Sequence, residues 1–367
     1  MASLLSLILI IYSFFLSSFT SASQHKICPF DAVYQFGDSL SDTGNSIRSS
    51  FGVNSSASRL PYGETYFRRP TGRWSDGLLA IDYINLALGL PLLNPYLERN
   101  ASFSHGVNFA VAGSTALNNT FFMKRNLFVS PGNIPLSVQL NWFKTHLKST
   151  CRTLSGYCSK RLTRALVFMG EIGTNDYFYS FGGKPIEETR TYVPYVVRAI
   201  KEGVREVVRA GAVNVIVPGI PPIGCVPTSL TFFQSNDTRS YDDMGCLKDL
   251  NEFAMYHNTH LHLALKDLRR EYPQAAILYA DFYAVSLSII RRAMALGFKK
   301  DVLLKACCGV GGDYNFSLDR PCGSPGVPVC SKPAQYLSWD GTHLTQEANK
   351  KLADWMIDNV LTKIPCK

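Results

Sequence analysis

Short apolar runs, rich in β-branched and aromatic residues, recur along the chain between longer segments with a helical pattern. Their length and composition suit strands that are buried on both faces of a parallel sheet. The five runs are Ala32–Phe36, Val107–Val111, Ala165–Met169, Val213–Val217 and Ala275–Tyr279. We therefore predict a mainly parallel, five-stranded sheet.

The intervening segments have the apolar spacing of amphipathic helices. In residues 77–88 an apolar residue recurs at every third or fourth position, and Gly89 ends the pattern. Residues 195–210 repeat this spacing and end at Gly211. A last helix is expected to begin with Thr345 as its N-cap. Strands that alternate with helices predict a right-handed, three-layer α/β/α sandwich.

No internal repeat, proline-rich tract or polar linker divides the chain, so we expect a single domain over residues 24–367. A content of 46% hydrophobic and 18% charged residues is typical of a compact globular protein and excludes extensive disorder. The net charge is +9, but lysine and arginine are scattered in ones and twos. This scatter favours a solvated basic surface over a nucleic-acid or anionic-membrane partner.

The first 23 residues carry an uncharged apolar run followed by small residues, a pattern that predicts a signal peptide cleaved near Ala22 or Ser23. A signal anchor is the alternative, but the run is short for a membrane-spanning helix. We expect the mature protein in the secretory pathway, bound for the extracellular space or the vacuole, without stable membrane insertion.

Ten cysteines follow this segment without the spacing of a zinc site, which favours disulfides in an oxidising compartment. The expected local pairs are Cys151 with Cys158, Cys225 with Cys246, and Cys307 or Cys308 with Cys322 or Cys330. Acceptor motifs for N-glycosylation agree with this route and occur at Asn54, Asn100, Asn118, Asn236 and Asn315.

Three polar turns follow the first three predicted strands, at 37–39, 112–114 and 170–176. Because functional groups gather at the carboxyl ends of parallel strands, we expect these turns to meet at one edge of the sheet.

Ser39 lies in the first of these turns. A serine hydroxyl becomes a good nucleophile only when a base removes its proton, and acyl transfer also needs donors for the developing oxyanion. Near the carboxyl terminus, Asp340 and His343 are three residues apart, so one turn supplies both a base and the carboxylate that orients it. Each motif alone is also typical of an ordinary loop. Together they predict a catalytic triad of Ser39, Asp340 and His343.

The other histidines are poorer candidates for the base. His25 lies at the expected amino terminus of the mature chain. His105 lies at the amino end of a strand, away from the edge where functional groups gather. Four are expected on polar helical surfaces, namely His146, His257, His260 and His262.

Four blocks occur in order along the chain, at Phe36–Asn45, Gly106–Gly113, Gly173–Tyr177 and Asp340–His343. In these blocks the sequence resembles the plant GDSL esterases and lipases within the SGNH hydrolases. The resemblance implies a flavodoxin-like fold and an oxyanion hole formed by the Ser39 and Gly113 backbone N–H groups and the Asn175 side-chain amide. This chemistry needs neither a metal nor an organic cofactor, and the sequence has no phosphate loop or metal-ligand cluster.

Within the family the chain is most similar to the acetylajmalan esterase type, which deacetylates an indole alkaloid, at residues 27–31, 61–65, 90–96 and 139–143. We expect a secreted serine carboxylester hydrolase that cleaves a small-molecule ester, such as the acetyl ester of a plant alkaloid. The alternatives are an acyltransferase with the same triad, a broader lipase, and a binding protein without catalysis.

Several remaining residues are assigned structural roles. Asp38 and Asp176 are expected to hold turns, and Arg73 to pair with a buried acid. Three aromatic side chains are more typical of the core than of a pocket: Trp74, Trp142 and Tyr177. Residues 121–135 and 229–243 have no readable pattern, and we expect such loops to shape the substrate pocket.

Overall fold

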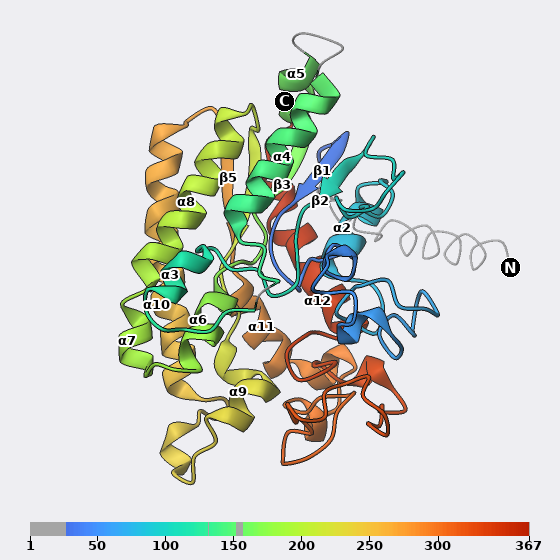
Figure 1. Cartoon of the computed structure of the whole chain (residues 1–367), viewed down its shortest axis with the longest axis vertical. Coiled ribbons are helices and arrows are strands. Elements are labelled where there is room, and N and C mark those ends of the chain that lie inside the picture. Colours follow the sequence, from blue (N-terminus) through green and yellow to red (C-terminus); the bar gives the residue numbers. More distant parts are fainter. Residues whose placement is uncertain (1–26, 131, 152–156, 367) are drawn as a thin grey trace, which may run out of the picture.

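The computed structural model describes residues 27–130, 132–151 and 157–366 (Figure 1). Its five strands are β1 (Ala32–Gln35), β2 (Gly106–Asn108), β3 (Ala165–Phe168), β4 (Asn214–Pro218) and β5 (Ala276–Ala280). Every neighbouring pair is parallel, in the order β2-β1-β3-β4-β5. The predicted five-stranded sheet is confirmed, although β2 ends three residues earlier than expected. The expected signal peptide over residues 1–23 lies outside the described residues.

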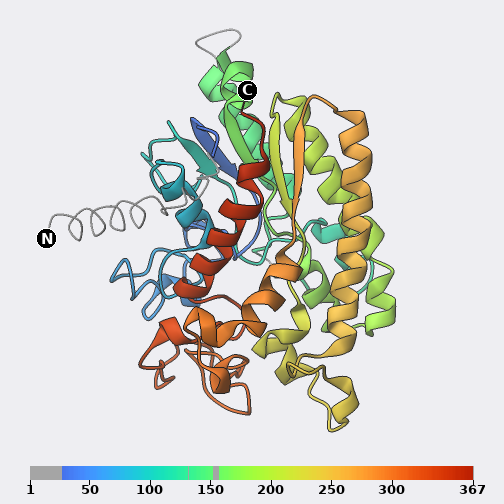
Figure 2. The ribbon, with the colours of Figure 1, turned by 180° about the vertical axis from the view of Figure 1, so that it is seen from behind.

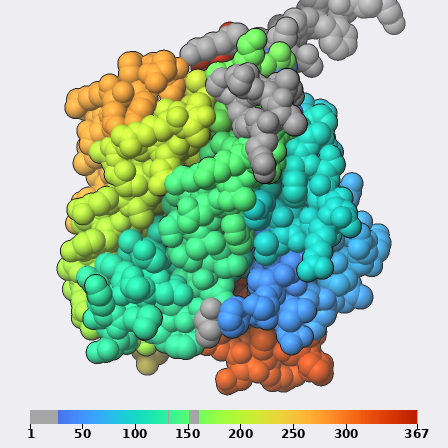
Figure 3. All heavy atoms as spheres, turned by 45° about the horizontal axis from the view of Figure 1, so that its top comes forward, coloured from blue at the N-terminus to red at the C-terminus, as the bar shows by residue number. Residues whose placement is uncertain are grey.

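Helices cover both faces of this sheet. They are α2 (Ala80–Ala87), α3 (Asn119–Met123), α4 (Leu136–Cys151), α5 (Tyr157–Thr163), α6 (Thr174–Phe181), α7 (Ile186–Arg190), α8 (Val193–Arg209), α9 (Pro227–Phe232), α10 (Lys248–Glu271), α11 (Phe282–Arg291) and α12 (Gln346–Asn359). Figures 1 and 3 show α4, α8 and α10 side by side on one face, and Figure 2 shows α12 on the other, where it packs against α2 and α11. The three-layer sandwich is therefore confirmed. None of the described helices has the length and apolarity needed to cross a membrane.

The apolar runs form central strands because both of their faces are buried. Successive side chains of a strand point to opposite faces. In β1, Ala32 and Tyr34 belong to the core under α4 and α8, whereas Val33 belongs to the core under α2 and α12. The predicted N-cap of the last helix is also present, since the Thr345 hydroxyl accepts a hydrogen bond from the Ala348 N–H at 3.2 Å.

Two histidines expected on polar surfaces are instead buried. His146 of α4 lies against Tyr34 and Phe109, and burial lowers its pKa to about 4. Nδ1 of His257, in α10, and the Tyr177 hydroxyl share a hydrogen bond of 2.6 Å. Burial lowers the pKa of His257 to about 3. The surface assignment of both was wrong because their helices turn these positions towards the sheet.

Four disulfides join described residues. The predicted Cys225–Cys246 pair is confirmed, and the open alternatives resolve into Cys307–Cys330 and Cys308–Cys322. Cys28–Cys366, which was not predicted, joins residues 338 positions apart near the two ends of the chain. The side chains of Cys151 and Cys158 lie outside the described part of the structure.

Candidate active site

The three polar turns at the carboxyl ends of the strands meet around Asn175, the second residue of α6. Its side-chain amide donates to Asp38 Oδ2 at 2.8 Å, in the turn after β1. It also donates to the Ser114 carbonyl at 3.0 Å, in the turn that follows β2. The expectation that these turns lie at one edge of the sheet is therefore confirmed.

A buried glutamine fixes the turn that carries Ser39. Gln139 of α4 accepts a hydrogen bond from the Gly37 N–H at 3.0 Å and donates to the Gly37 carbonyl at 2.8 Å. Gly37 has φ +132°, and a Cβ there would lie 3.0 Å from the Glu171 carbonyl oxygen, so only glycine suits this position. The chain consequently leaves β1 in one fixed direction and places Ser39 in the lining of a cavity.

Asp340 and His343 form a buried pair in one turn before α12. His343 Nδ1 lies 2.6 Å from Asp340 Oδ2, and the backbone N–H of His343 donates to Oδ1 at 2.9 Å. Burial alone would raise the pKa of Asp340, but the charge and hydrogen bonds of His343 outweigh it and lower that pKa to about 2. The carboxyl group is therefore ionised at any physiological pH and can orient the imidazole.

Two aromatic residues that the sequence did not link to this pair complete its surroundings. The Tyr62 hydroxyl donates to Asp340 Oδ2 at 2.7 Å, so the oxygen that faces His343 also receives a second hydrogen bond. Burial, and then the charge of Asp340, raise the pKa of Tyr62, which keeps it a donor. Trp74 packs beside the His343 ring with 4.9 Å between ring centroids.

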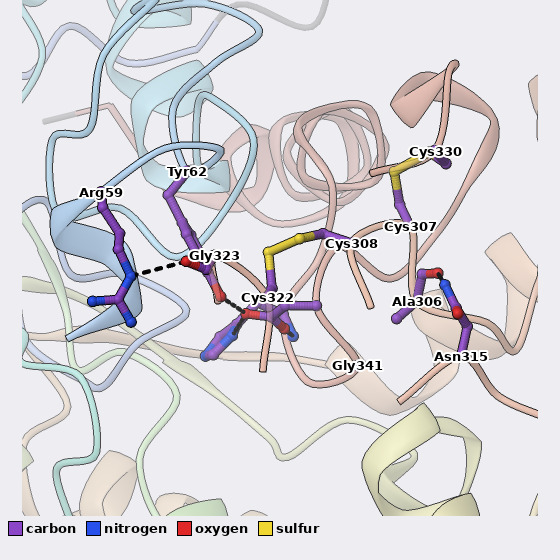
Figure 4. Close-up of a disulfide and its surroundings, with 12 residues drawn as sticks. Arg59, Tyr62, Ala306, Cys307, Cys308, Asn315, Cys322, Gly323, Cys330 and Gly341 are labelled. Atoms are coloured by element: carbon purple, nitrogen blue, oxygen red, sulfur yellow. Dashed lines mark hydrogen bonds and ion pairs between the residues drawn. A yellow bond between two sulfur atoms is a disulfide. The ribbon is translucent and has the colours of Figure 1, made fainter. Parts of the chain in front are cut away.

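A disulfide-bonded segment braces the same turn. The backbone N–H groups of Cys307 and Cys308 donate to the Ser338 and Trp339 carbonyls at 3.0 and 2.7 Å. Cys307 is bonded to Cys330 and Cys308 to Cys322, so two disulfides fix the segment that lies beside the turn (Figure 4). The position of Asp340 and His343 thus depends on residues outside α12.

Ser39, Asn175 and His343 line one cavity of about 130 Å³. Gly113 lies outside the cavity lining, near the Tyr179 hydroxyl. Among the described residues, the backbone N–H groups of Ser39 and Gly113 have no hydrogen-bond partner. Both remain available as donors, whereas both amide hydrogens of Asn175 are engaged.

The rest of the cavity is lined mainly by apolar side chains from elements that the sequence did not single out. These are the segment 221–227, one face of α11 and one face of α12. None of the described residues of 121–135 or 229–243 lines it, so the expectation that these loops shape the pocket was wrong. The pocket wall is instead made of the segment 221–227 and of helix faces, whose apolar spacing is indistinguishable in sequence from that of ordinary core residues.

Asp38 and Asp176 hold turns, as expected. Asp38 Oδ1 accepts from the Leu40 N–H at 2.9 Å, and Asp176 accepts from the N–H groups of Ala116 and Leu117 at 2.7 and 2.9 Å. Arg73 forms the expected buried ion pair, with Asp82 at 2.8 Å. Tyr177 is a core residue, and Trp142 stacks on Tyr96.

A second carboxyl group, which the sequence did not reveal, lies beside Asp38. It belongs to Glu171, and both residues line the cavity. Burial and the neighbouring Glu171 raise the pKa of Asp38, while burial raises the pKa of Glu171 to about 7. Two carboxyl groups in contact cannot both be ionised without repulsion, so the pair holds a proton.

Because of this carboxyl pair, we expect the free energy of unfolding to fall as the pH rises. The folded pKa of Glu171 lies above its ordinary value of 4.5, so its contribution is complete below pH 4.5 and disappears as the pH passes about 7. The free energy of unfolding should fall by up to about 1.4 kcal/mol per pH unit for each group that titrates. Glu171→Gln should make this decline shallower, which urea unfolding at pH 5, 6, 7 and 8 would measure. Equal slopes in both proteins would contradict it.

The glycosylation motifs differ in accessibility. Asn54, Asn100, Asn118 and Asn236 are exposed. Asn315 is half-buried, and its amide donates to the Ala306 carbonyl at 2.8 Å (Figure 4).

Comparison with known proteins gives long matches. Residues 33–356, which include all four sequence blocks, match the family described as GDSL-like Lipase/Acylhydrolase. The chain is 49% identical to an acetylajmalan esterase of Rauvolfia serpentina, over 96% of this chain and 91% of that protein. It is 46% identical to a GDSL esterase/lipase of Arabidopsis thaliana over 98% of both chains. It is also 42% identical to a sinapine esterase of Brassica napus, over 92% of this chain and 88% of that one.

Proposed function

Since this chain belongs to the GDSL-like lipase/acylhydrolase family and is a carboxylic ester hydrolase, we propose that it cleaves small-molecule esters through an acyl-enzyme on Ser39. The observation that carries the proposal is one cavity lined by Ser39, Asn175 and His343, with Asp340 hydrogen bonded behind the imidazole. A nucleophile, a base and an orienting carboxylate in this arrangement suit acyl transfer.

In the first step, His343 Nε2 removes the proton of Ser39 Oγ while that oxygen attacks the ester carbonyl carbon. Asp340 holds Nδ1–H and stabilises the imidazolium that forms. The carbonyl oxygen becomes an oxyanion, and we assign its donors to the backbone N–H groups of Ser39 and Gly113 and the amide of Asn175. That amide exchanges one of its present partners for the oxyanion.

The tetrahedral intermediate then collapses. The bond between the acyl carbon and the alcohol oxygen breaks, His343 gives its proton to the departing alcohol, and the acyl group stays on Ser39. Water next attacks the acyl carbon while His343 takes its proton. The bond to Ser39 breaks, the proton returns to Oγ, and a carboxylic acid leaves.

We propose an acetyl ester of a plant specialised metabolite, such as an alkaloid, as one substrate. Its support is the likeness to acetylajmalan esterases, which reaches 49% identity. Screening acetylated alkaloids for release of acetate tests this choice independently of the catalytic machinery. With an added alcohol as acceptor, we expect free acid as the main product, and a preferred new ester would identify a transferase instead.

Covalent labelling tests the acyl-enzyme. A p-nitrophenyl alkylphosphonate should release one p-nitrophenolate per chain, abolish hydrolysis of p-nitrophenyl acetate, and add its mass to the peptide that contains Ser39. The proposal fails if the label is found on another residue, or if labelling at Ser39 leaves hydrolysis intact.

Tyr62 is assigned a positioning role through Asp340. In Tyr62→Phe, the carboxylate loses one donor and becomes a stronger partner for the imidazolium, so the acid limb of the profile of kcat/KM against pH should move to higher pH. We expect kcat/KM at the optimum to fall roughly tenfold, as for a lost hydrogen bond to a charged group. Tyr66→Phe, at a position 53% exposed in the same segment, is the control. A purely structural role for Tyr62 would lower activity without moving the acid limb.

We propose that the protein enters the secretory pathway and reaches the cell wall or the vacuole. The four disulfides between described residues and the four exposed acceptor asparagines support this route. Glycan occupancy should be found at Asn54, Asn100, Asn118 and Asn236, because these side chains are exposed, and should be lower at Asn315, whose amide is half-buried against the Ala306 carbonyl. Peptide mapping of the protein from plant tissue, before and after glycan removal, measures this.

A further inference from the structure

The cavity beside Ser39 is larger than an acetyl group requires. It measures about 130 Å³. On the same measure a water molecule, similar in size to the methyl of an acetyl group, needs about 10–15 Å³, and a dry protein cavity of about 150 Å³ binds benzene. An acetyl group bound to Ser39 would therefore leave most of this space unfilled.

The wall away from the catalytic residues is apolar and made of two helix faces. On α11, Phe282, Ser286 and Ile289 recur at the spacing of one face. On α12, Ala348 and Leu352 are one turn apart and face the same cavity. Ser286 is the polar exception on this wall, so the space suits a hydrocarbon group.

Core residues form part of the cavity wall. Leu337, Ala348 and Leu352 are buried, with 8%, 1% and 5% of their surfaces exposed. A pocket of this volume has no room for the bulky alcohol part of a metabolite ester, but it accepts a short chain or a single ring. The smaller half of the substrate, the acyl group, is the part that fits.

We propose that the pocket between α11 and α12 binds the acyl group, and that this enzyme prefers esters of apolar acyl groups of about four to six carbons, or of benzoyl size, over acetyl esters. This inference rests on the proposed function, because the acyl group must be attached to Ser39. Each methylene buried in the pocket should raise kcat/KM about three- to fourfold until the pocket is full.

Leu352 and Phe282 separate this pocket from a second cavity. That cavity, of about 30 Å³, lies between α2, α12 and the end of β3, and both residues line it as well. Shortening Leu352 would join the two spaces. Leu352→Ala should therefore lengthen the pocket. A larger side chain at Ser286, on the α11 wall, should shorten it.

The test compares kcat/KM for p-nitrophenyl esters of acetate, butanoate, hexanoate, octanoate and dodecanoate. Wild type should be fastest with butanoate or hexanoate and at least tenfold slower with dodecanoate. Ser286→Phe should lower the ratio of hexanoate to acetate at least about 30-fold, while Leu352→Ala should move the optimum towards octanoate. Ser288→Phe, on the same helix but outside the cavity lining, should keep the wild-type ratio.

A matched series of acetate esters with lengthening alcohols tests the direction of binding. If the proposal is right, the relative kcat/KM values along this alcohol series should be the same in Ser286→Phe as in wild type. It is overturned if Ser286→Phe changes the alcohol series instead of the acyl series, or if wild-type activity declines steadily from acetate upwards.

A binding measurement separates failure of the pocket from failure of the proposed catalysis. Hexanamide, a neutral acyl analogue, should raise the melting temperature of wild type and of Ser39→Ala, but not that of Ser286→Phe. If hexanamide binds in this pattern while no ester is cleaved, the proposed function falls and the pocket assignment stands. If esters are cleaved but hexanamide stabilises all three proteins equally, the pocket assignment falls.

Discussion

Ser39→Ala should lower kcat for p-nitrophenyl ester hydrolysis at least about 10⁴-fold, as removal of a triad member does in serine hydrolases. The variant keeps the cavity, the Asp340–His343 pair and every hydrogen bond that fixes the turn through Gly37. Its free energy of unfolding should therefore stay within about 1 kcal/mol of wild type. Steady-state kinetics and urea unfolding on the same preparation measure both quantities.

Ser41→Ala is the matched control. Ser41 lies in the same turn, is buried to the same extent as Ser39, and lines the smaller neighbouring cavity instead of the one with His343. We expect its kcat within a few-fold of wild type. If Ser39→Ala retained more than a hundredth of wild-type activity, or if both variants lost activity equally, the hydroxyl of Ser39 would not be the nucleophile.

Arg73→Met should destabilise the protein by about 3–5 kcal/mol, because it leaves the buried carboxylate of Asp82 without its partner. The pair is bidentate, with Nε and Nη2 of Arg73 each 2.8 Å from an Asp82 oxygen. Only 6% of Arg73 and 1% of Asp82 is exposed, so water cannot replace the lost partner. Urea unfolding at pH 7 gives the loss.

The double variant Arg73→Met, Asp82→Asn separates the charge from the packing. Asp82 also accepts the Leu79 N–H at the start of α2, at 2.9 Å, and an asparagine can still do this. The double variant should therefore regain at least about half of the stability lost in the single one, because the isolated charge is gone. Equal losses in the two variants would show that the methylenes of Arg73, and not its charge, stabilise this region.

The fold was largely predictable because its central strands are buried on both faces. Such strands appear in the sequence as continuous apolar runs, and each of the five runs coincides with a strand to within a few residues. The candidate triad was predictable in composition for a different reason. Ser39 follows a strand directly, and Asp340 and His343 share one turn. The local sequence alone is therefore enough to identify each of them as a candidate.

The supporting residues were not predictable in the same way. Tyr62 reaches Asp340 across 278 residues of sequence, from a segment without strand or α-helix. Gln139 and His146 did leave a signal. They continue the inward stripe of α4 formed by Leu136, Leu140 and Phe143, and a polar residue at an inward position of an amphipathic helix usually has a buried partner.

The Cys28–Cys366 bond makes the polypeptide, in covalent terms, a closed ring that contains nearly all of the described chain. A protease that cuts once in an exposed loop inside this ring opens it without producing two separate molecules. The nicked protein should migrate as one species on a non-reducing gel and as two fragments after reduction. The ring could also be reopened at such a loop, with Cys28 and Cys366 joined by a short peptide, to give a circular permutant whose new ends lie far from the old ones.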